Sequence, residues 1–274
     1  MAERKFPSSL TDRQWEIIRK FLPLARAGGR PRKTDLRNVL DAVYYLMRSG
    51  CAWRYLPPEF PPWPTVYYYF RHWERSGLWK NVHDFLRDEV RVQLGRESAP
   101  STLIVDSQTV KAARGLGRGY SGFKGIRGRK RHVLVDTLGF LHAVSIQPAN
   151  LNDTVSGHEL FSKDFRKERM ERILADQGYR GTFVRKSIEQ LGIKPIIPES
   201  IEPTGQGRKK LSREKLSNRR LKGSKKGRWI VERTFAWLNH FRRLSRDYEF
   251  LPLVSECGLY IVMSLIMLKR LLNS

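Results

Sequence analysis

The spacing of apolar residues changes near Pro100, and this change most constrains the fold. Before it, apolar residues recur at the three- and four-residue spacing of helices, as in Trp15, Ile18 and Leu22. After it, short apolar runs such as Thr102–Val105 alternate with helical patterns, which is typical of an α/β domain with a mixed sheet. The sequence therefore predicts a helical domain over residues 1–98 and an α/β domain over residues 99–274.

Capping and turn residues divide the first domain into four expected helices. Thr11 begins a capping-box pattern at the start of the first helix. Thr34 is placed to cap the second helix, and Gly50 is placed to end it. The third helix is expected over residues 65–76 and the fourth over residues 79–94.

The third expected helix is rich in Tyr, Arg and His and follows a short connection, as in helix-turn-helix-like DNA-reading domains. Tyr67 and Arg71 are the candidates for its DNA-facing side chains. Arg30, Arg32 and Lys33 belong to a thin Gly-Arg-Pro-Arg stretch that suits the narrow minor groove of A·T-rich DNA. A plain helical bundle and a plain linker fit the same patterns, so both alternatives stay open.

The second domain is expected to alternate strands and helices. The expected strands cover residues 102–105, 132–135, 140–146, 173–175 and 193–197. The expected helices cover residues 153–165, 179–191, 227–245 and a final apolar segment. The segment 251–268 approaches the length of a membrane span but contains Pro, Ser and Glu, so a buried helix is the better interpretation.

The charge of the chain points to a polyanionic partner. Its 52 Lys and Arg exceed its 27 Asp and Glu, which gives a net charge of +25. Residues 111–131 and 208–228 hold long basic runs that are almost free of acids and lack an apolar face, so nucleic acid is favoured over membrane. The candidates for phosphate contacts are Lys111, Lys124, Arg129, Lys130 and Arg131. Solvated loops are the alternative for such runs.

Composition also bears on the cellular compartment. The chain is 40% hydrophobic and 11% aromatic, which excludes a wholly disordered protein. Its two cysteines, Cys51 and Cys257, cannot build a disulfide framework, so a reducing cytoplasm is expected. The first residues are polar and lack the apolar core of a signal peptide.

Three acidic residues stand out as candidates for metal chemistry. Asp106 and Asp176 each follow an apolar run, so each is expected at the carboxyl end of a strand, and Glu232 lies on the long expected helix. Such oxygen-rich sets suit divalent cations, and two ions about 4 Å apart can support phosphodiester displacement. Capping for the aspartates and a pair with Arg228 for Glu232 are the alternatives. Capping is also the interpretation for Asp136 and Asp153.

Five motifs occur in order after residue 100: Asp106–Lys111, Gly128–His132 preceded by Lys124, Val135–Gly139, Ala175–Gly181, and Arg228–Asn239, which is followed by Phe241–Leu244. Three more stretches match before residue 100: Leu10–Trp15, Gly29–Pro31 and Gly50–Pro57. With these motifs the chain resembles the DDE transposases of bacterial insertion sequences, in the broad group of insertion-sequence families four and five. The resemblance covers almost the whole chain.

The resemblance implies a ribonuclease-H-like catalytic domain whose Asp106, Asp176 and Glu232 hold two Mg²⁺ ions, for which Mn²⁺ substitutes. Arg228 and Glu232 match the Tyr-x2-Arg-x3-Glu-x6-Lys signature of the group, whereas Lys225 and Asn239 depart from it. A basic loop over about residues 198–226 takes the place of a large insertion domain.

The implied activity is cut-and-paste transposition of double-stranded DNA, with a homodimer bringing together two terminal inverted repeats and then target DNA. Arg228 is the expected contact for the phosphate near the cleavage site. Two other interpretations stay open: a catalytically silent DNA-binding descendant of such an enzyme, and a metal-dependent nuclease that cuts without joining strands.

Overall fold

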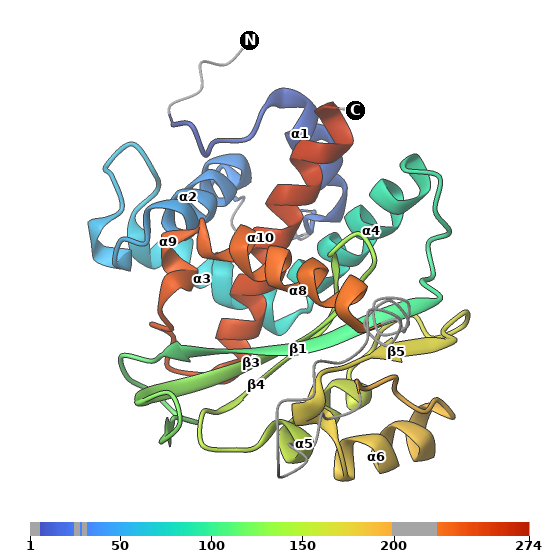
Figure 1. Ribbon diagram of the computed structural model, residues 1–274. Coiled ribbons are helices and arrows are strands. Elements are labelled where there is room, and N and C mark those ends of the chain that lie inside the picture. The colour runs from blue at the N-terminus through green and yellow to red at the C-terminus, as the bar shows by residue number, and fades with distance from the viewer. Residues whose placement is uncertain (1–5, 25–27, 29–31, 199–223, 274) are drawn as a thin grey trace, which may run out of the picture. The chain divides into compact units, whose positions relative to one another are not determined.

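The computed structural model describes residues 6–24, 28, 32–198 and 224–273, with the side chains of residues 224–228 and 273 excepted. The chain forms two compact units (Figure 1). The first, here the helical unit, contains residues 1–98, 110–118 and 237–274, and the second, the α/β unit, contains residues 99–109 and 119–236. The C-terminal helices thus group with the N-terminal helices, whereas the sequence placed them in the second domain.

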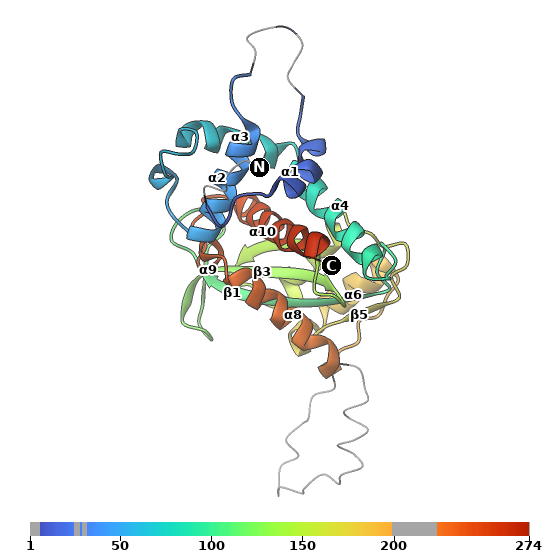
Figure 2. The same cartoon turned by 90° about the horizontal axis from the view of Figure 1, so that it is seen from above.

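The helical unit is built around its last helix. Its elements are α1 (Asp12–Ile18), α2 (Leu36–Ser49), α3 (Trp63–Arg75), α4 (Leu78–Gln93), α9 (Arg242–Ser245) and α10 (Pro252–Asn273), with short 3-10 turns at Arg19–Phe21 and Trp53–Tyr55. α10 is long and apolar enough to cross a membrane by length and composition alone. Most of it is buried, however, against α4, α2 and α1 (Figure 2). It is therefore the central helix of a packed core.

Local signals predicted the helix ends well. The capping box at Thr11 is confirmed, because its side chain accepts from the Gln14 N–H and the Gln14 side chain accepts from the Thr11 N–H. Gly50 ends α2 in the left-handed conformation with φ of 73°, as expected. The N-cap of α2 is Asp35, so the assignment to Thr34 is wrong by one residue.

The α/β unit contains a five-stranded mixed sheet. Its strands are β1 (Thr102–Lys111), β2 (Gly119–Ser121), β3 (Ile126–Asp136), β4 (Leu141–Pro148) and β5 (Arg172–Leu174). The order is β2-β3-β1-β5, with β4 also paired to β3. β3 runs antiparallel to β2 and β4, whereas β1 and β5 run parallel. This confirms the expected α/β architecture with a mixed sheet.

Several expected boundaries in this unit are wrong. β1 and β3 are much longer than predicted and occupy part of the basic run that was expected to be a loop. Residues 193–197 contribute only an isolated bridge from Ile196 to Leu174, not a strand. The predicted helix over residues 227–245 is divided into α8 (Ser224–Asn239) and α9.

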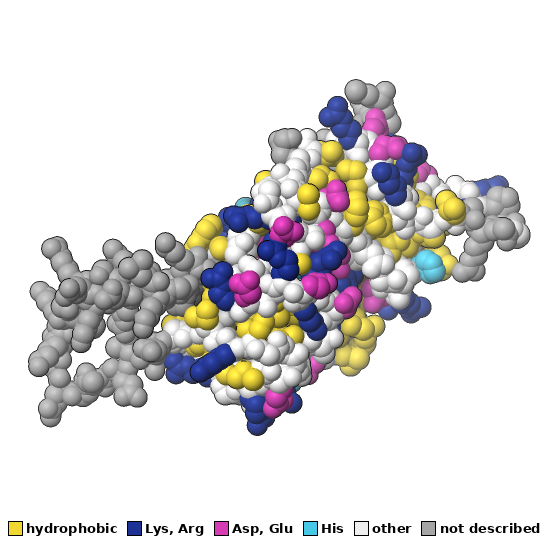
Figure 3. All heavy atoms as spheres, turned by 90° about the vertical axis from the view of Figure 1, so that its right-hand side faces the viewer, with side chains coloured by type: hydrophobic (Ala, Val, Ile, Leu, Met, Phe, Trp, Pro, Cys, Tyr) yellow, Lys and Arg dark blue, Asp and Glu magenta, His cyan; other side chains and the backbone are white. Residues whose placement is uncertain are grey.

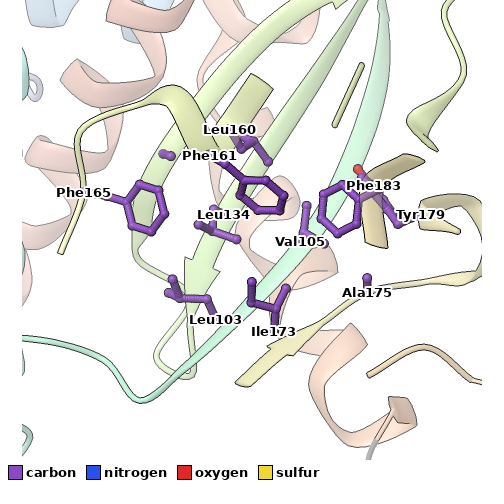
Figure 4. Close-up of a cluster of buried hydrophobic side chains, with 11 residues drawn as sticks. Leu103, Val105, Leu134, Leu160, Phe161, Phe165, Ile173, Ala175, Tyr179 and Phe183 are labelled. Atoms are coloured by element: carbon purple, nitrogen blue, oxygen red, sulfur yellow. The ribbon is translucent and has the colours of Figure 1, made fainter. Parts of the chain in front are cut away.

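One face of the sheet packs against α5 (Asp153–Ser156), the following 3-10 turn (Gly157–Ser162) and α6 (Thr182–Leu191). Leu103 and Val105 of β1 belong to the apolar cluster on this side, together with Phe161, Tyr179 and Phe183 (Figure 4). Since side chains alternate along a strand, Ile104 and Asp106 project from the other face. Figures 1 and 2 show α8 on that other side of the sheet.

Candidate active site

The pairing of β1 with β5 brings two of the predicted acids together. Thr102 lies opposite Arg172 and Ile104 lies opposite Leu174, so the two strands are offset by 70 residues. Asp106 and Asp176 each follow the last paired position of this register by two residues. Asp176 lies just beyond β5 as predicted, but Asp106 lies inside β1 and not at its end, because β1 continues to Lys111.

Asp153 is a further carboxylate near Asp176, which the sequence analysis interpreted as a cap. The N-cap of α5 is Asn152, whose side chain makes no capping hydrogen bond, and Asp153 is the first residue of the helix. Instead, Asp153 accepts a hydrogen bond from the Ser107 hydroxyl at 2.9 Å and lies 3.0 Å from the Lys130 ammonium. The capping interpretation of Asp153 is therefore wrong. For Asp136 it is confirmed, since this side chain accepts the N–H groups of Leu138 and Phe140 in the β3–β4 turn.

Gly178 marks the point where two of these acids approach the backbone. A Cβ added there would lie 3.1 Å from Asp176 Oδ1 and 3.2 Å from Asp153 Oδ2. Asp176 Oδ1 also accepts the Gly178 N–H at 2.8 Å, which begins the 3-10 turn Gln177–Tyr179. The absence of a side chain at Gly178 thus leaves room for both carboxylates, which the sequence did not reveal.

A buried hydrogen-bonded chain lies behind the carboxylates. His132 Nδ1 is 2.9 Å from the Tyr179 hydroxyl, and His132 Nε2 is 2.8 Å from Ser156 Oγ. Burial lowers the pKa of His132 to about 4, against the opposing charge of Asp153. Burial, followed by the charges of Asp153 and Asp106, raises the pKa of Tyr179 well above 10. Both side chains are therefore neutral near pH 7, and His132 is structural rather than a phosphate donor.

α8 carries the third predicted acid and is anchored at the β3–β4 turn. The buried Thr234 hydroxyl donates to the Gly139 carbonyl at 2.8 Å, and the Arg233 guanidinium donates to the Leu138 carbonyl at 2.8 Å. Glu232 precedes these two residues and is exposed. Among the described residues, no three Asp, Glu, His or Cys side chains lie close enough together to hold a metal ion. The described residues thus contain Asp106, Asp176 and Glu232 in one structural unit but no preformed three-residue metal site.

Two family models match parts of this chain. A family model described as "Transposase DDE domain" matches residues 97–267, which is more than half of the chain. The chain belongs to the DDE transposase family. A second model, described as "Putative transposase of IS4/5 family", matches residues 10–83 of the transposase. The two models together span both structural units.

Individual relatives cover smaller parts of the transposase. It is 31% identical over 130 residues to the "Putative transposase for insertion sequence element IS402" of Burkholderia cepacia, a match that covers 44% of this chain and 54% of that protein. It thus spans about half of the length of this relative. It is also 35% identical over 103 residues to the uncharacterized protein y4sN of Sinorhizobium fredii, which covers 38% of this chain and 76% of that protein.

The structure separates the predicted DNA-contacting residues of the α/β unit into two groups. Lys124 is exposed, as is Lys111 at the end of β1. Arg129, Lys130 and Arg131 are only 0%, 8% and 1% exposed, and they lie in the part of β3 that pairs with Ile146–Pro148 of β4. Side chains that are this buried are not available to contact the DNA backbone, so the expectation for these three residues disagrees with the structure.

In the helical unit, Arg32 and Lys33 are exposed, and Arg32 donates to the Pro23 carbonyl. Tyr67 is 40% exposed and packs edge-on against Trp53. Arg71 lies 3.3 Å from Glu74 and is mostly buried, so it does not present a free DNA-facing side chain. Arg30, the side chain of Arg228 and most of the basic loop at 198–226 lie outside the described residues. On the face drawn in Figure 3, basic side chains are interspersed with acidic ones.

Proposed function

We propose that this transposase moves an insertion sequence by cut-and-paste transposition, with Asp106, Asp176 and Glu232 as the ligands of two Mg²⁺ ions. The observation that supports the proposal is the β1–β5 register, in which Ile104 lies opposite Leu174 and each of these residues is followed two positions later by one of the aspartates. The anchoring of α8 on the β3–β4 turn supports it, because the helix brings a third carboxylate to the same structural unit.

The donor set fits the ions. Asp106 and Asp176 are half-buried and Glu232 is exposed, and carboxylate oxygens such as theirs are the ligands that Mg²⁺ prefers. Bound ions would activate the attacking oxygen and neutralise charge on the scissile phosphate, and Mn²⁺ would serve in the same way. The role of the chain is to hold its carboxylates at fixed positions. The Gly178 N–H and the Ser107 N–H do this for Asp176 and Asp106, each by a hydrogen bond to the carboxylate.

DNA would be held by both units. The helical unit, with Arg30, Arg32, Lys33 and Tyr67 as candidate contacts, would bind the terminal inverted repeats through a helix-turn-helix-like arrangement. Lys111, Lys124 and Arg228 would contact phosphates nearer to the catalytic residues. Because two ends must be joined to one target, we expect a homodimer on DNA.

The test is a Mg²⁺-dependent reaction of the purified protein with labelled duplexes that carry the inverted repeats flanking the gene, together with a target plasmid. Asp106→Asn, Asp176→Asn and Glu232→Gln should each abolish cleavage and joining but leave DNA binding intact. Glu189→Gln is the matched control, since Glu189 is an exposed acid of the same unit that pairs with Lys186 on α6.

Each outcome separates the candidate functions. Cleavage without joined product would indicate a nuclease, and binding without cleavage would indicate a silent DNA-binding descendant. Full cleavage by Asp106→Asn or Glu232→Gln would overturn the assignment of the catalytic residues.

A further inference from the structure

A short hairpin between β1 and β3 presents an unusual combination of side chains. In this segment, here the 119–127 hairpin, Gly119 pairs with Gly128, Tyr120 with Arg127 and Ser121 with Ile126. Its tip is a turn in which the Gly125 N–H donates to the Gly122 carbonyl, and Gly125 takes the left-handed conformation with φ of 60°. Phe123 and Lys124 therefore occupy the two central positions of the turn.

Phe123 is the most exposed large hydrophobic side chain in the described part of the protein. It is 97% exposed, and Tyr120 in the adjoining strand is 61% exposed. Tyr120 lies directly opposite Arg127, which is also exposed, so the two side chains share one face of the hairpin. The hairpin thus offers aromatic rings beside the cations Lys124 and Arg127.

The base of the hairpin is held in place by close packing. A Cβ at Gly119 would overlap the side-chain oxygen of Asn150, so the backbone of β2 lies directly against that residue. The Ala149 N–H donates to the Gly128 carbonyl on the other strand. The tip is different, because a Cβ at Gly122 or Gly125 would meet nothing within 4 Å. A fixed base and an uncovered tip suit a side chain that inserts into a ligand.

The charge of the segment identifies the ligand. Residues 111–131 contain eight Lys or Arg and no Asp or Glu, so a polyanion is favoured over a protein surface of mixed charge. A planar ring beside two cations fits a nucleobase stacked on the ring, with neighbouring phosphates paired to the cations. A second copy of this chain would bring its own basic hairpin and is disfavoured by repulsion.

We propose that Phe123 stacks on an unpaired or unstacked base of the bound DNA, with Lys124 and Arg127 contacting the flanking phosphates. This inference rests on the proposed function only in that the chain binds DNA. Apolar side chains inserted between base steps partly unstack the bases and kink the duplex. Tyr120 would provide a second ring next to Arg127.

The experiment compares two duplexes of identical sequence from the element end, one fully paired and one with a single unpaired base, in EDTA so that no cleavage occurs. The wild-type protein should bind the duplex with the unpaired base more tightly, by about 5- to 150-fold for one stacked base. Phe123→Ala should lose this preference, and Phe123→Trp should keep it. Lys124→Ala should weaken binding to both duplexes equally.

Ile188→Ala on α6 is the matched control, since Ile188 is an exposed apolar residue of the same unit. Phe123 contributes no buried surface, so its variants should fold like the wild type. Equal binding of both duplexes by the wild type, or an unchanged preference in Phe123→Ala, would overturn the inference. So would a Phe123→Ala protein that differs from the wild type only in oligomeric mass. A protein that keeps the preference but never cleaves would contradict the proposed function alone.

Discussion

Replacing Thr234 with valine tests whether one hydrogen bond keeps α8, and with it Glu232, in position. Thr234 is fully buried, and its hydroxyl is 2.8 Å from the Gly139 carbonyl and 3.1 Å from the Ile230 carbonyl. Valine has nearly the same shape but cannot donate. The substitution therefore leaves the carbonyl of Gly139 without this donor and creates no cavity.

The expected loss of stability is about 1–3 kcal/mol, the usual cost of an unsatisfied buried polar group. Urea unfolding measures it as a lower transition midpoint at an unchanged dependence on urea concentration. If Glu232 acts as proposed, cleavage should fall by more than stability explains, since a misplacement of about 1 Å in a catalytic group can cost about 100-fold.

Thr234→Ser is the control for the catalytic effect. It removes a methyl group, which costs about 1 kcal/mol, but keeps the hydroxyl that reaches Gly139. We therefore expect Thr234→Ser to cleave DNA much as the wild type does, although it is also less stable. A valine variant that unfolds with wild-type free energy would refute the anchoring role. A valine variant that is destabilised but fully active would refute its connection to Glu232.

Three further results are expected. Burial lowers the pKa of His132 to about 4, so the neutral imidazole stabilises the fold above about pH 6.5. The free energy of unfolding should therefore fall by about 2 kcal/mol between about pH 7.5 and pH 5. His132→Gln should flatten this pH dependence, and a variant with the pH dependence of the wild type would contradict the prediction. DNA affinity should fall steeply with salt concentration. Lys124→Ala should reduce the slope of log affinity against log salt concentration by about 0.9 if it loses one phosphate contact. A slope equal to that of the wild type would exclude that contact. Gly157→Ala should lower the free energy of unfolding in urea by about 1–3 kcal/mol, because the added Cβ would overlap the Tyr179 ring. Gly122→Ala is the control and should be as stable as the wild type, because its Cβ would meet no atom within 4 Å. Equal stability of the two variants would contradict this packing.

The sequence predicted the two strands that precede the aspartates because both strands are apolar runs, and these strands are neighbours in the sheet. Asp106 and Asp176 are 70 residues apart, and the β1–β5 register has the same offset. What the sequence could not predict is where β1 ends. The residues after Asp106 are mostly polar and have no strong strand signal, and β1 extends through them because neighbouring strands pair with its backbone.

Burial of the basic residues was equally hidden. Arg129 and Arg131 belong to a run that is typical of a solvated or DNA-binding loop, yet both are buried in β3, where they pair with Pro148 and Ile146 of β4. Asp153 shows the same limit. Its position after Asn152 favours a cap, but its partners are Ser107, 46 residues away, and Lys130. Local patterns predict caps and turns well, whereas partners brought together by strand pairing depend on the whole sheet.

The three proposed catalytic acids are therefore not equivalent. Asp106 lies in β1 and Asp176 just beyond β5, and each carboxylate accepts a backbone N–H of its own segment, from Ser107 and Gly178. Glu232 depends on a helix whose described attachment to the sheet includes the hydrogen bonds of Arg233 and Thr234 to a turn. Side-chain contacts of this kind yield more readily than strand pairing does. We therefore expect bound metal and DNA to shift the position of Glu232 more than that of either aspartate. Substitutions at the β3–β4 turn should likewise affect catalysis by displacing Glu232 rather than the aspartates.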